Sequence, residues 1–226
     1  MKQEVMVLRT DCTLNLESYQ RAIRFDSLDD SQEQALALFE LANSRLQPKV
    51  LLKPLIIDTH EEVENLPSVA IGSVRFVGKA LSALKDIHRV IGYVATCGNE
   101  LETYALTEFD MLAPYWLDEL KTQALACARK KLREFCKEQY GITKPLSLNP
   151  GSGNVDIWPI EQMGGLFELL GGTQGIGVKL TESSLMIPNK TIAGLLFASP
   201  LTDYESCAYC EREQCPNRRV PFKERL

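Results

Sequence analysis

The sequence predicts an α+β protein, and three observations support that class. Residues 32–47 and 110–140 repeat apolar side chains at spacings of three and four positions, which indicates two amphipathic helices. Short runs such as VIGYVAT at 90–96 are apolar and β-branched, which is typical of buried strands. Helices and strands do not alternate as in βαβ units, so an α+β arrangement is favoured over a doubly wound parallel sheet.

The N-terminal part begins with a weakly alternating run, residues 4–8, that predicts a first strand. A short helix is expected over 14–25, and polar N-cap candidates stand directly before the helix at 32–47. Residues 49–58 are mostly apolar and extended in pattern. Pro54 predicts an edge strand or a break there, because proline cannot donate a hydrogen bond to a neighbouring strand.

The middle of the chain mixes short elements. Residues 61–67 read as a polar connector, and 69–77 as a strand that bends at Gly72. A short helix is expected over 79–86. After the buried strand at 90–96, a turn leads to a helix that is expected to begin near Glu100.

The longest helical segment has Pro114 in its first turn and Gly141 as its C-cap. A further helix is predicted over 159–170. Two short strands are expected over 185–187 and 191–197, on either side of a Pro-Asn turn.

The composition is that of a soluble globular protein. The 226 residues carry a net charge of −5, with 45% hydrophobic and 24% charged residues. This acidic balance argues against a general nucleic-acid binder, and no apolar run is long enough to span a bilayer. The first residues contain no apolar signal-peptide core, so we expect a cytoplasmic protein without nucleic-acid or membrane partners.

The seven cysteines fall into two groups. An odd count without a visible secretion signal argues against a disulfide framework and leaves redox, catalytic or metal roles for the clustered ones. The scattered group is Cys12, Cys97, Cys127 and Cys136, and the clustered group is Cys207, Cys210 and Cys215.

Residues 146–200 hold most of the candidates for function. They open with a turn cluster, Asn149, Pro150, Gly151, Ser152 and Gly153, followed by Asn154. Glycines allow close approach of a ligand or positive φ, but a plain connecting loop explains the same pattern. Neither a P-loop nor a dinucleotide fingerprint is present.

Two other residues of this stretch have competing interpretations. Trp158 is either a core anchor or a stacking surface for a ligand. Glu182 either caps or pairs locally, for instance with Lys190 across the Pro188 turn, or has a catalytic role. The local pattern alone favours the structural interpretation in each case.

Taken together, the motifs resemble the activation (reactivation) domain of cobalamin-dependent methionine synthase, in a stand-alone form. The resemblance covers most of residues 70–198. Its first block has the form PG-x-G-x-x-D-x-W-P-[LI]-x-x-Q and its second IGV-x-LTES-x-x-M-x-P-x-K-[ST], with VAT-x-G-x-EL upstream. The matching positions are Pro150, Gly151, Asp156, Trp158, Pro159, Ile160 and Gln162, then Ile176 to Val178, Leu180 to Ser183, Met186, Pro188, Lys190 and Thr191, and upstream Val94 to Thr96, Gly98, Glu100 and Leu101.

The resemblance implies a twisted antiparallel sheet with flanking helices, over a domain that we place at 1–202. It also implies a function: returning cob(II)alamin on a corrinoid-binding methyltransferase, or its cobalamin domain, to the active cycle. S-adenosylmethionine is the methyl donor in the family. The resemblance assigns the ligand groove to Asn149, Pro150, Gly151, Ser152, Gly153 and Trp158, with Glu182 at a nearby turn.

The chain departs from the family at positions that contact the ligand. Ser147 stands where the family has an arginine, and Ser152 stands where it has a tyrosine. The acidic residue of the long helix aligns with Ala126. These departures favour an alternative in another class: a non-catalytic module that binds or escorts a corrinoid protein and has lost S-adenosylmethionine binding.

Residues 203–226 form a cysteine-rich tail. Cys207, Cys210 and Cys215 have the spacing C-x2-C-x4-C, and Pro216 follows the last. Thiolates so spaced hold an iron–sulfur cluster or zinc, with a fourth ligand from another cysteine, His60, His88 or an exogenous group. Free thiols in a tail are the other interpretation. A thiol oxidoreductase is disfavoured, since no thioredoxin-like βαβ context surrounds the CxxC.

Overall fold

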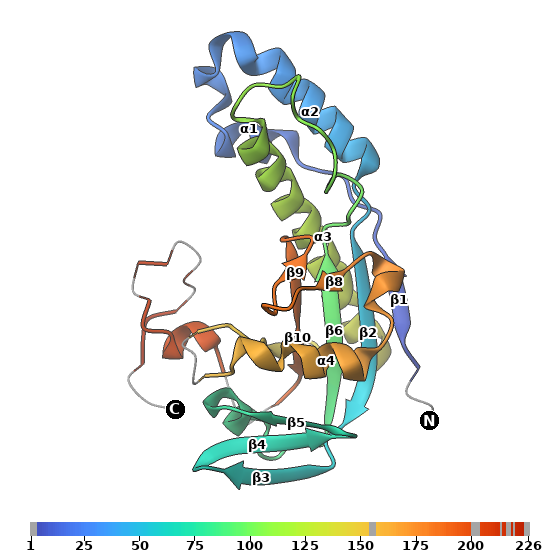
Figure 1. Ribbon diagram of the computed structural model, residues 1–226, viewed down its shortest axis with the longest axis vertical. Coiled ribbons are helices and arrows are strands. Elements are labelled where there is room, and N and C mark those ends of the chain that lie inside the picture. Colours follow the sequence, from blue (N-terminus) through green and yellow to red (C-terminus); the bar gives the residue numbers. More distant parts are fainter. Residues whose placement is uncertain are drawn as a thin grey trace.

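The computed structural model confirms an α+β fold with an antiparallel sheet and flanking helices (Figure 1). It describes residues 4–153, 157–199, 204–212, 214–215, 218 and 220–223. Figure 1 shows the helices α1 and α2 beside one end of the long helix α3, with a small second sheet at the opposite end of the molecule.

The main sheet has five antiparallel strands in the order β1-β2-β6-β10-β7. Its central strand β6 is buried from Val90 to Thr96, as the apolar run predicts. The five strands are β1 (Met6–Arg9), β2 (Lys49–Ile56), β6 (Arg89–Thr96), β7 (Leu146–Leu148) and β10 (Thr191–Phe197). The sequence predicted all of these except β7.

Pro54 lies inside β2 without interrupting it. It stands opposite Ile91 of β6, whereas β1 pairs with β2 only from Lys49 to Leu52. Proline is therefore accommodated beyond the end of β1, where that side of β2 is not part of the described sheet ladder.

The small sheet consists of β3 (Thr59–Val63), β4 (Leu66–Ile71) and β5 (Val74–Val77). The polar connector expected at 61–67 is therefore wrong, because Glu64 and Asn65 form a tight turn with φ of 52° and 64° between two paired strands. Gly72 does not bend one strand but turns the chain from β4 to β5, with φ of 57°.

Helices lie on both faces of the main sheet. The α-helices are α1 (Leu16–Ala22), α2 (Gln32–Arg45), α3 (Ala113–Tyr140) and α4 (Met163–Leu170). The short 3-10 helices are η1 (Phe25–Ser27), η2 (Asp29–Ser31), η3 (Lys79–Leu84), η4 (Ile160–Gln162), η5 (Thr173–Ile176) and η6 (Ser206–Tyr209). A two-stranded hairpin of β8 (Lys179–Leu180) and β9 (Met186–Ile187) precedes β10.

The helix expected near Glu100 is not formed, and 97–112 is a run of turns and loops. The Glu100 carboxylate instead accepts hydrogen bonds from Lys49 Nζ at 2.9 Å and from the Gln47 backbone N–H at 3.2 Å. These long-range contacts satisfy its charge and tie the segment to the start of β2.

The long helix α3 belongs to two hydrophobic clusters. Trp116, Leu120 and Ala124 in its first half pack with α1 and α2. Ala128 and Leu132 in its second half pack on the sheet face that carries Tyr93 and Leu52. The other sheet face packs against α4. The helix α3 therefore joins the sheet to the N-terminal helices α1 and α2, which we call the helical head.

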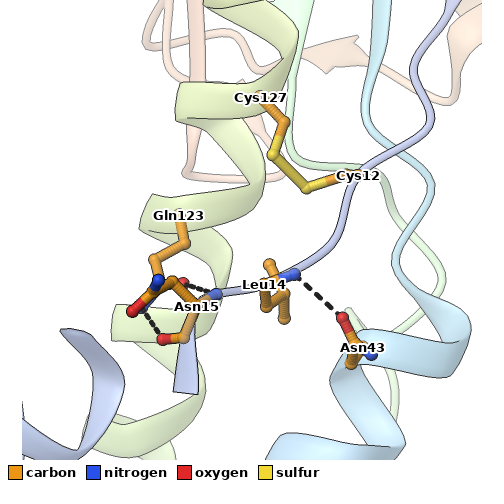
Figure 2. Close-up of a disulfide and its surroundings, with 6 residues drawn as sticks. All are labelled: Cys12, Leu14, Asn15, Asn43, Gln123 and Cys127. Carbon is orange, nitrogen blue, oxygen red and sulfur yellow. Dashed lines mark hydrogen bonds between the residues drawn. A yellow bond between two sulfur atoms is a disulfide. The ribbon is translucent and has the colours of Figure 1, made fainter. Parts of the chain in front are cut away.

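A disulfide joins Cys12 and Cys127, although the odd cysteine count argued against a disulfide framework (Figure 2). The two Cα atoms are 5.8 Å apart, within the range that a disulfide spans. An odd cysteine count disfavours a fully paired framework, but it leaves room for one bridge. The other five cysteines are free thiols.

Candidate functional site

The predicted ligand loop, residues 149–153, follows β7 and folds back on itself. The Ser152 N–H donates to Asn149 O at 3.1 Å, and the Gly151 N–H donates to Trp158 O at 2.8 Å. Gly151 has φ of 77°, and a Cβ there would lie 2.9 Å from the Ile160 side chain. The turn therefore requires glycine for its backbone and its packing, while Gly151 and Gly153 remain exposed to solvent.

A ring of hydrogen bonds anchors this loop to the sheet. Asn149 Nδ2 donates to Tyr93 Oη at 2.8 Å and to the Ala193 carbonyl at 2.7 Å. Ser147 Oγ lies 2.7 Å from Tyr93 Oη and donates to Asn149 Oδ1 at 3.0 Å. The Asn149 amide is thus committed to holding the loop in place.

Sequence reasoning missed Tyr93 as a member of this ring. It lies inside β6, 2% exposed, and nothing in the local VIGYVAT pattern separates it from the apolar residues around it. Only the antiparallel pairing of β6 and β7 with β10 brings its hydroxyl to Ser147 and Asn149.

Trp158 acts as a core anchor. Its side chain is fully buried, stacks edge-on against Phe76 at a centroid distance of 5.4 Å, and donates from Nε1 to Gln162 Oε1 at 3.1 Å. It has no accessible surface to present to a ligand, so its predicted place in a groove is corrected to a supporting position beneath the loop.

Gln162, four residues after Trp158, binds the backbone of β5 through its side-chain amide. Its side-chain amide accepts from the Val77 N–H at 2.8 Å and donates to the Val77 carbonyl at 2.7 Å. The Ala80 N–H also donates to Ile157 O at 2.9 Å. The first motif block therefore fastens residues 157–162 to β5 and η3.

The second motif block is likewise largely structural. Lys190 pairs with Asp118 of α3 at 2.8 Å, not with Glu182 across the turn. Glu182 is exposed at the tip of the β8–β9 hairpin, where Thr181 Oγ1 accepts from the Leu185 N–H at 3.0 Å. This hairpin is a different element from the loop at 149–153, which follows β7.

The tail is packed against the protein. Tyr204 is buried in the sheet core and stacks on Tyr209 at 5.5 Å. Arg218 donates to the carbonyls of Cys207, Cys210, Arg212 and Val220. The guanidinium thus closes the described part of the tail into a loop.

The three tail thiols are half-buried, but the structure does not gather them into a metal site. Among the described residues, no group of three or more His, Cys, Asp or Glu side chains is placed to hold an ion. The iron–sulfur or zinc site at Cys207, Cys210 and Cys215 therefore stays a prediction.

The buried thiols are poor candidates for completing such a site. Burial raises the pKa of Cys97 to about 12, with opposing contributions from Lys121, which lowers it, and Glu102, which raises it. Burial also raises the pKa of Cys136 to about 11. Both are protonated at neutral pH, and Cys12 and Cys127 are already bonded to each other.

Some predicted positions fall outside the described residues. These are Asn154 and Asp156 of the first motif block, and Pro216 of the tail.

A shallow hollow of about 370 Å³ lies away from the predicted loop, between the end of β2, the β4–β5 turn and the C-terminal end of α4. Its polar groups already have partners. Lys53 Nζ donates to Leu169 O at 2.7 Å, and Asp58 Oδ2 accepts from the Gly72 N–H at 2.6 Å. None of the predicted site residues lines it.

Two comparisons relate part of this sequence, and separately its fold, to the methionine synthase activation domain. Residues 132–219 match the family model described as "Vitamin B12 dependent methionine synthase, activation domain". The match runs from the second half of α3 through the loop and into the tail. It includes all three clustered cysteines.

A solved structure shares the fold. "Crystal Structure of the MetH Reactivation Domain bound to AdoHcy" aligns with a TM-score of 0.58 and 16% sequence identity, over 90% of this chain and 81% of that one. No curated protein matches the sequence. In the described part of the chain, no helix has both the length and the apolar character that crossing a bilayer requires.

Proposed function

We propose that this chain is a stand-alone reactivation protein for a corrinoid-dependent methyltransferase. It binds the cobalamin domain of that partner and returns oxidised cobalamin to the catalytic cycle. One electron converts cob(II)alamin to cob(I)alamin, which then takes the methyl group of S-adenosylmethionine and releases S-adenosylhomocysteine. The observation that carries the proposal is that the activation-domain match includes the loop at 149–153 and its supporting strands.

The loop supplies what a ligand of this kind needs from the backbone. Gly151 and Gly153 are exposed and free of side chains, so the adenosyl or amino-acid part of a ligand can approach the main chain closely. Asn149 and Tyr93 hold the loop in one conformation before binding, which lowers the entropic cost of association. The solved reactivation domain of the same fold is bound to AdoHcy.

Calorimetry with S-adenosylhomocysteine tests the ligand part of the proposal. We expect binding in the micromolar range for the intact chain and loss of at least about tenfold in affinity for Gly151→Ala, which must shift the turn. Gly141→Ala is the matched control. It also replaces a glycine of positive φ, 68°, but a Cβ there meets nothing within 4 Å. Equal effects of the two substitutions on affinity would refute a binding role for the loop.

Absorption spectroscopy tests the reaction. The intact chain, a corrinoid methyltransferase, a low-potential reductant and S-adenosylmethionine are mixed under anaerobic conditions. We expect the cob(II)alamin spectrum to be replaced by that of methylcobalamin only when all four are present. An unchanged spectrum with every partner tried would overturn the proposal.

The alternative is an escort module that binds a corrinoid protein without using S-adenosylmethionine. The observation in its favour is that the Ser147 hydroxyl, at the position where the family has arginine, is engaged with Tyr93 and Asn149. This side chain offers no positive charge to a ligand carboxylate. Partner binding without any S-adenosylhomocysteine heat in calorimetry would favour the escort.

The tail thiols are part of the same proposal. Cys207, Cys210 and Cys215 would supply an iron–sulfur cluster or a zinc ion, in an arrangement that the described residues do not form on their own. Metal and sulfide analysis of anaerobically purified protein tests this. Iron with sulfide would support a redox role, zinc a structural one, and less than about 0.1 metal ion per chain would refute both.

A further inference from the structure

The Cys12–Cys127 disulfide lies where the N-terminal helical head meets the sheet. Cys127 is the α3 residue between Ala124, which packs with the head, and Ala128, which packs on the sheet. Cys12 lies on the extended segment between β1 and α1. The bond therefore joins the segment that leads into the helical head to the middle of α3, the helix that packs with both the head and the sheet.

The same junction is held by hydrogen bonds that do not involve sulfur (Figure 2). The Leu14 N–H donates to Asn43 Oδ1 at 2.9 Å, and the Asn15 N–H donates to Gln123 Oε1 at 2.8 Å. Gln123 Nε2 donates back to Asn15 O at 3.3 Å. The head consequently has enough contacts to stay folded on α3 when the sulfur bond is broken.

Both cysteines are half-buried, unlike the fully buried thiols Cys97 and Cys136. The bond therefore joins two residues that are each partly exposed to solvent. Lys131 follows Cys127 by four residues, a spacing that places side chains on the same helix face. Positive charge beside a sulfur stabilises the thiolate that leaves when a disulfide is attacked.

We propose that Cys12 and Cys127 form a reversible thiol–disulfide site whose co-reactant is a dithiol. A thiolate of the dithiol attacks Cys12 Sγ, and Cys127 leaves as a thiolate and takes up a proton. The second thiol of the reductant then attacks the mixed disulfide and releases Cys12. Two electrons and two protons pass to the protein, and the dithiol becomes a cyclic disulfide.

The state of this site sets how firmly the segment at 10–22 is held on α3. In the oxidised form the segment is covalently fixed, whereas in the reduced form only the hydrogen bonds to Asn43 and Gln123 and the packing of the head retain it. This inference concerns the head and α3, so it does not depend on the proposed function.

The test uses the full chain at neutral pH under native conditions, with dithiothreitol as the dithiol. After acid quenching and unfolding, mass spectrometry counts the alkylated thiols. We expect five before reduction, as in the structure, and seven after it, the two new ones at Cys12 and Cys127. Oxidised dithiothreitol should restore the same pair. Resistance to reduction until the chain unfolds, or reoxidation to other pairs, would overturn the proposal.

Hydrogen exchange measures the structural consequence. We expect amide exchange in 10–22 to become at least about tenfold faster on reduction, while α4 stays unchanged. Cys12→Ser should reproduce the reduced state in the absence of reductant. A triple Cys207→Ser, Cys210→Ser, Cys215→Ser variant should keep the full redox response, which excludes the tail thiols as its source. Identical exchange in both redox states of the natural chain would overturn the effect on the head, whether or not a variant folds.

Discussion

Replacing Asn149 with alanine should loosen the loop at 149–153 and destabilise the protein measurably. The substitution removes two donated hydrogen bonds, to Tyr93 Oη and the Ala193 carbonyl, and one accepted from Ser147. Each such bond contributes about 0.5–1.5 kcal/mol net, and buried partners left unpaired add to the cost. We therefore expect the free energy of unfolding to fall by about 2–4 kcal/mol.

Urea unfolding followed by circular dichroism measures this change. The slope of the free energy against urea should stay constant, so that a shift in midpoint reports stability alone. Asn189→Ala is the matched control, since Asn189 is exposed and its amide donates a long hydrogen bond of 3.4 Å to Asp118 Oδ1. It should change stability by less than about 0.5 kcal/mol.

A double-mutant cycle separates the contribution of this hydrogen-bond ring from a general loss of stability caused by the substitutions. Tyr93→Phe removes only the hydroxyl, and its effect combined with Asn149→Ala should fall short of the sum by about 0.5–3 kcal/mol. Additive effects would show that the two side chains act independently. Asn149→Ala with a cost no larger than that of Asn189→Ala would refute the idea that this ring anchors the loop.

Three further predictions concern other parts of the fold. Replacing Cys12 and Cys127 with serine should lower stability by about 4–5 kcal/mol, because the bond closes a loop with a sequence separation of 115. Gly194→Ala should cost about 3 kcal/mol or more, since a Cβ would lie 2.1 Å from Leu148 O in the β10–β7 pair. Stability should fall by about 1.4 kcal/mol per pH unit above pH 9 on account of Cys97, because the folded thiol keeps its proton up to about pH 12 while the unfolded one loses it near 9.0.

Each of these has a control. In metal-free protein, a Cys207→Ser, Cys210→Ser double variant removes two thiols without a disulfide and should leave the free energy of unfolding within about 0.5 kcal/mol of that of the natural chain. Gly164→Ala, in α4 with nothing within 4 Å of the added Cβ, should stabilise by about 0.5–1 kcal/mol. Cys97→Ala should flatten the decline above pH 9, measured by urea unfolding at several pH values, and an unchanged slope would contradict the assignment to this thiol.

Local signals predicted the helices well. In α3 the first-turn proline at Pro114 and the C-cap Gly141, which has φ of 68°, both stand where the sequence places them. Because its apolar residues keep the helical spacing over many turns, such a helix can be predicted without knowledge of the elements it packs against. The buried strand β6 was equally clear, since every residue from Val90 to Thr96 faces protein.

Elements that depend on distant partners were missed. In β3 the polar run Thr59–Val63 is mostly exposed, and it is a strand because it pairs with β4 across the Glu64-Asn65 turn. The short strand β7 exists because β10 lies beside it. No local pattern reports such pairings.

The motif residues could be found from sequence, but their roles could not. Trp158 and Gln162 were recognised by their spacing, whereas their partners Phe76 and Val77 lie about eighty residues earlier in the chain. The disulfide was missed for the same reason, because a separation of 115 residues leaves no local trace.

The pairing of Gln162 with Val77 has a consequence for solubility. β5 is an outer strand of the small sheet, and an outer strand presents unpaired N–H and C=O groups to which another chain can add. The Gln162 amide occupies both groups of Val77, as a neighbouring strand would, and so keeps this position of the edge from pairing with another chain. A single side chain thereby protects the last rung of the small sheet.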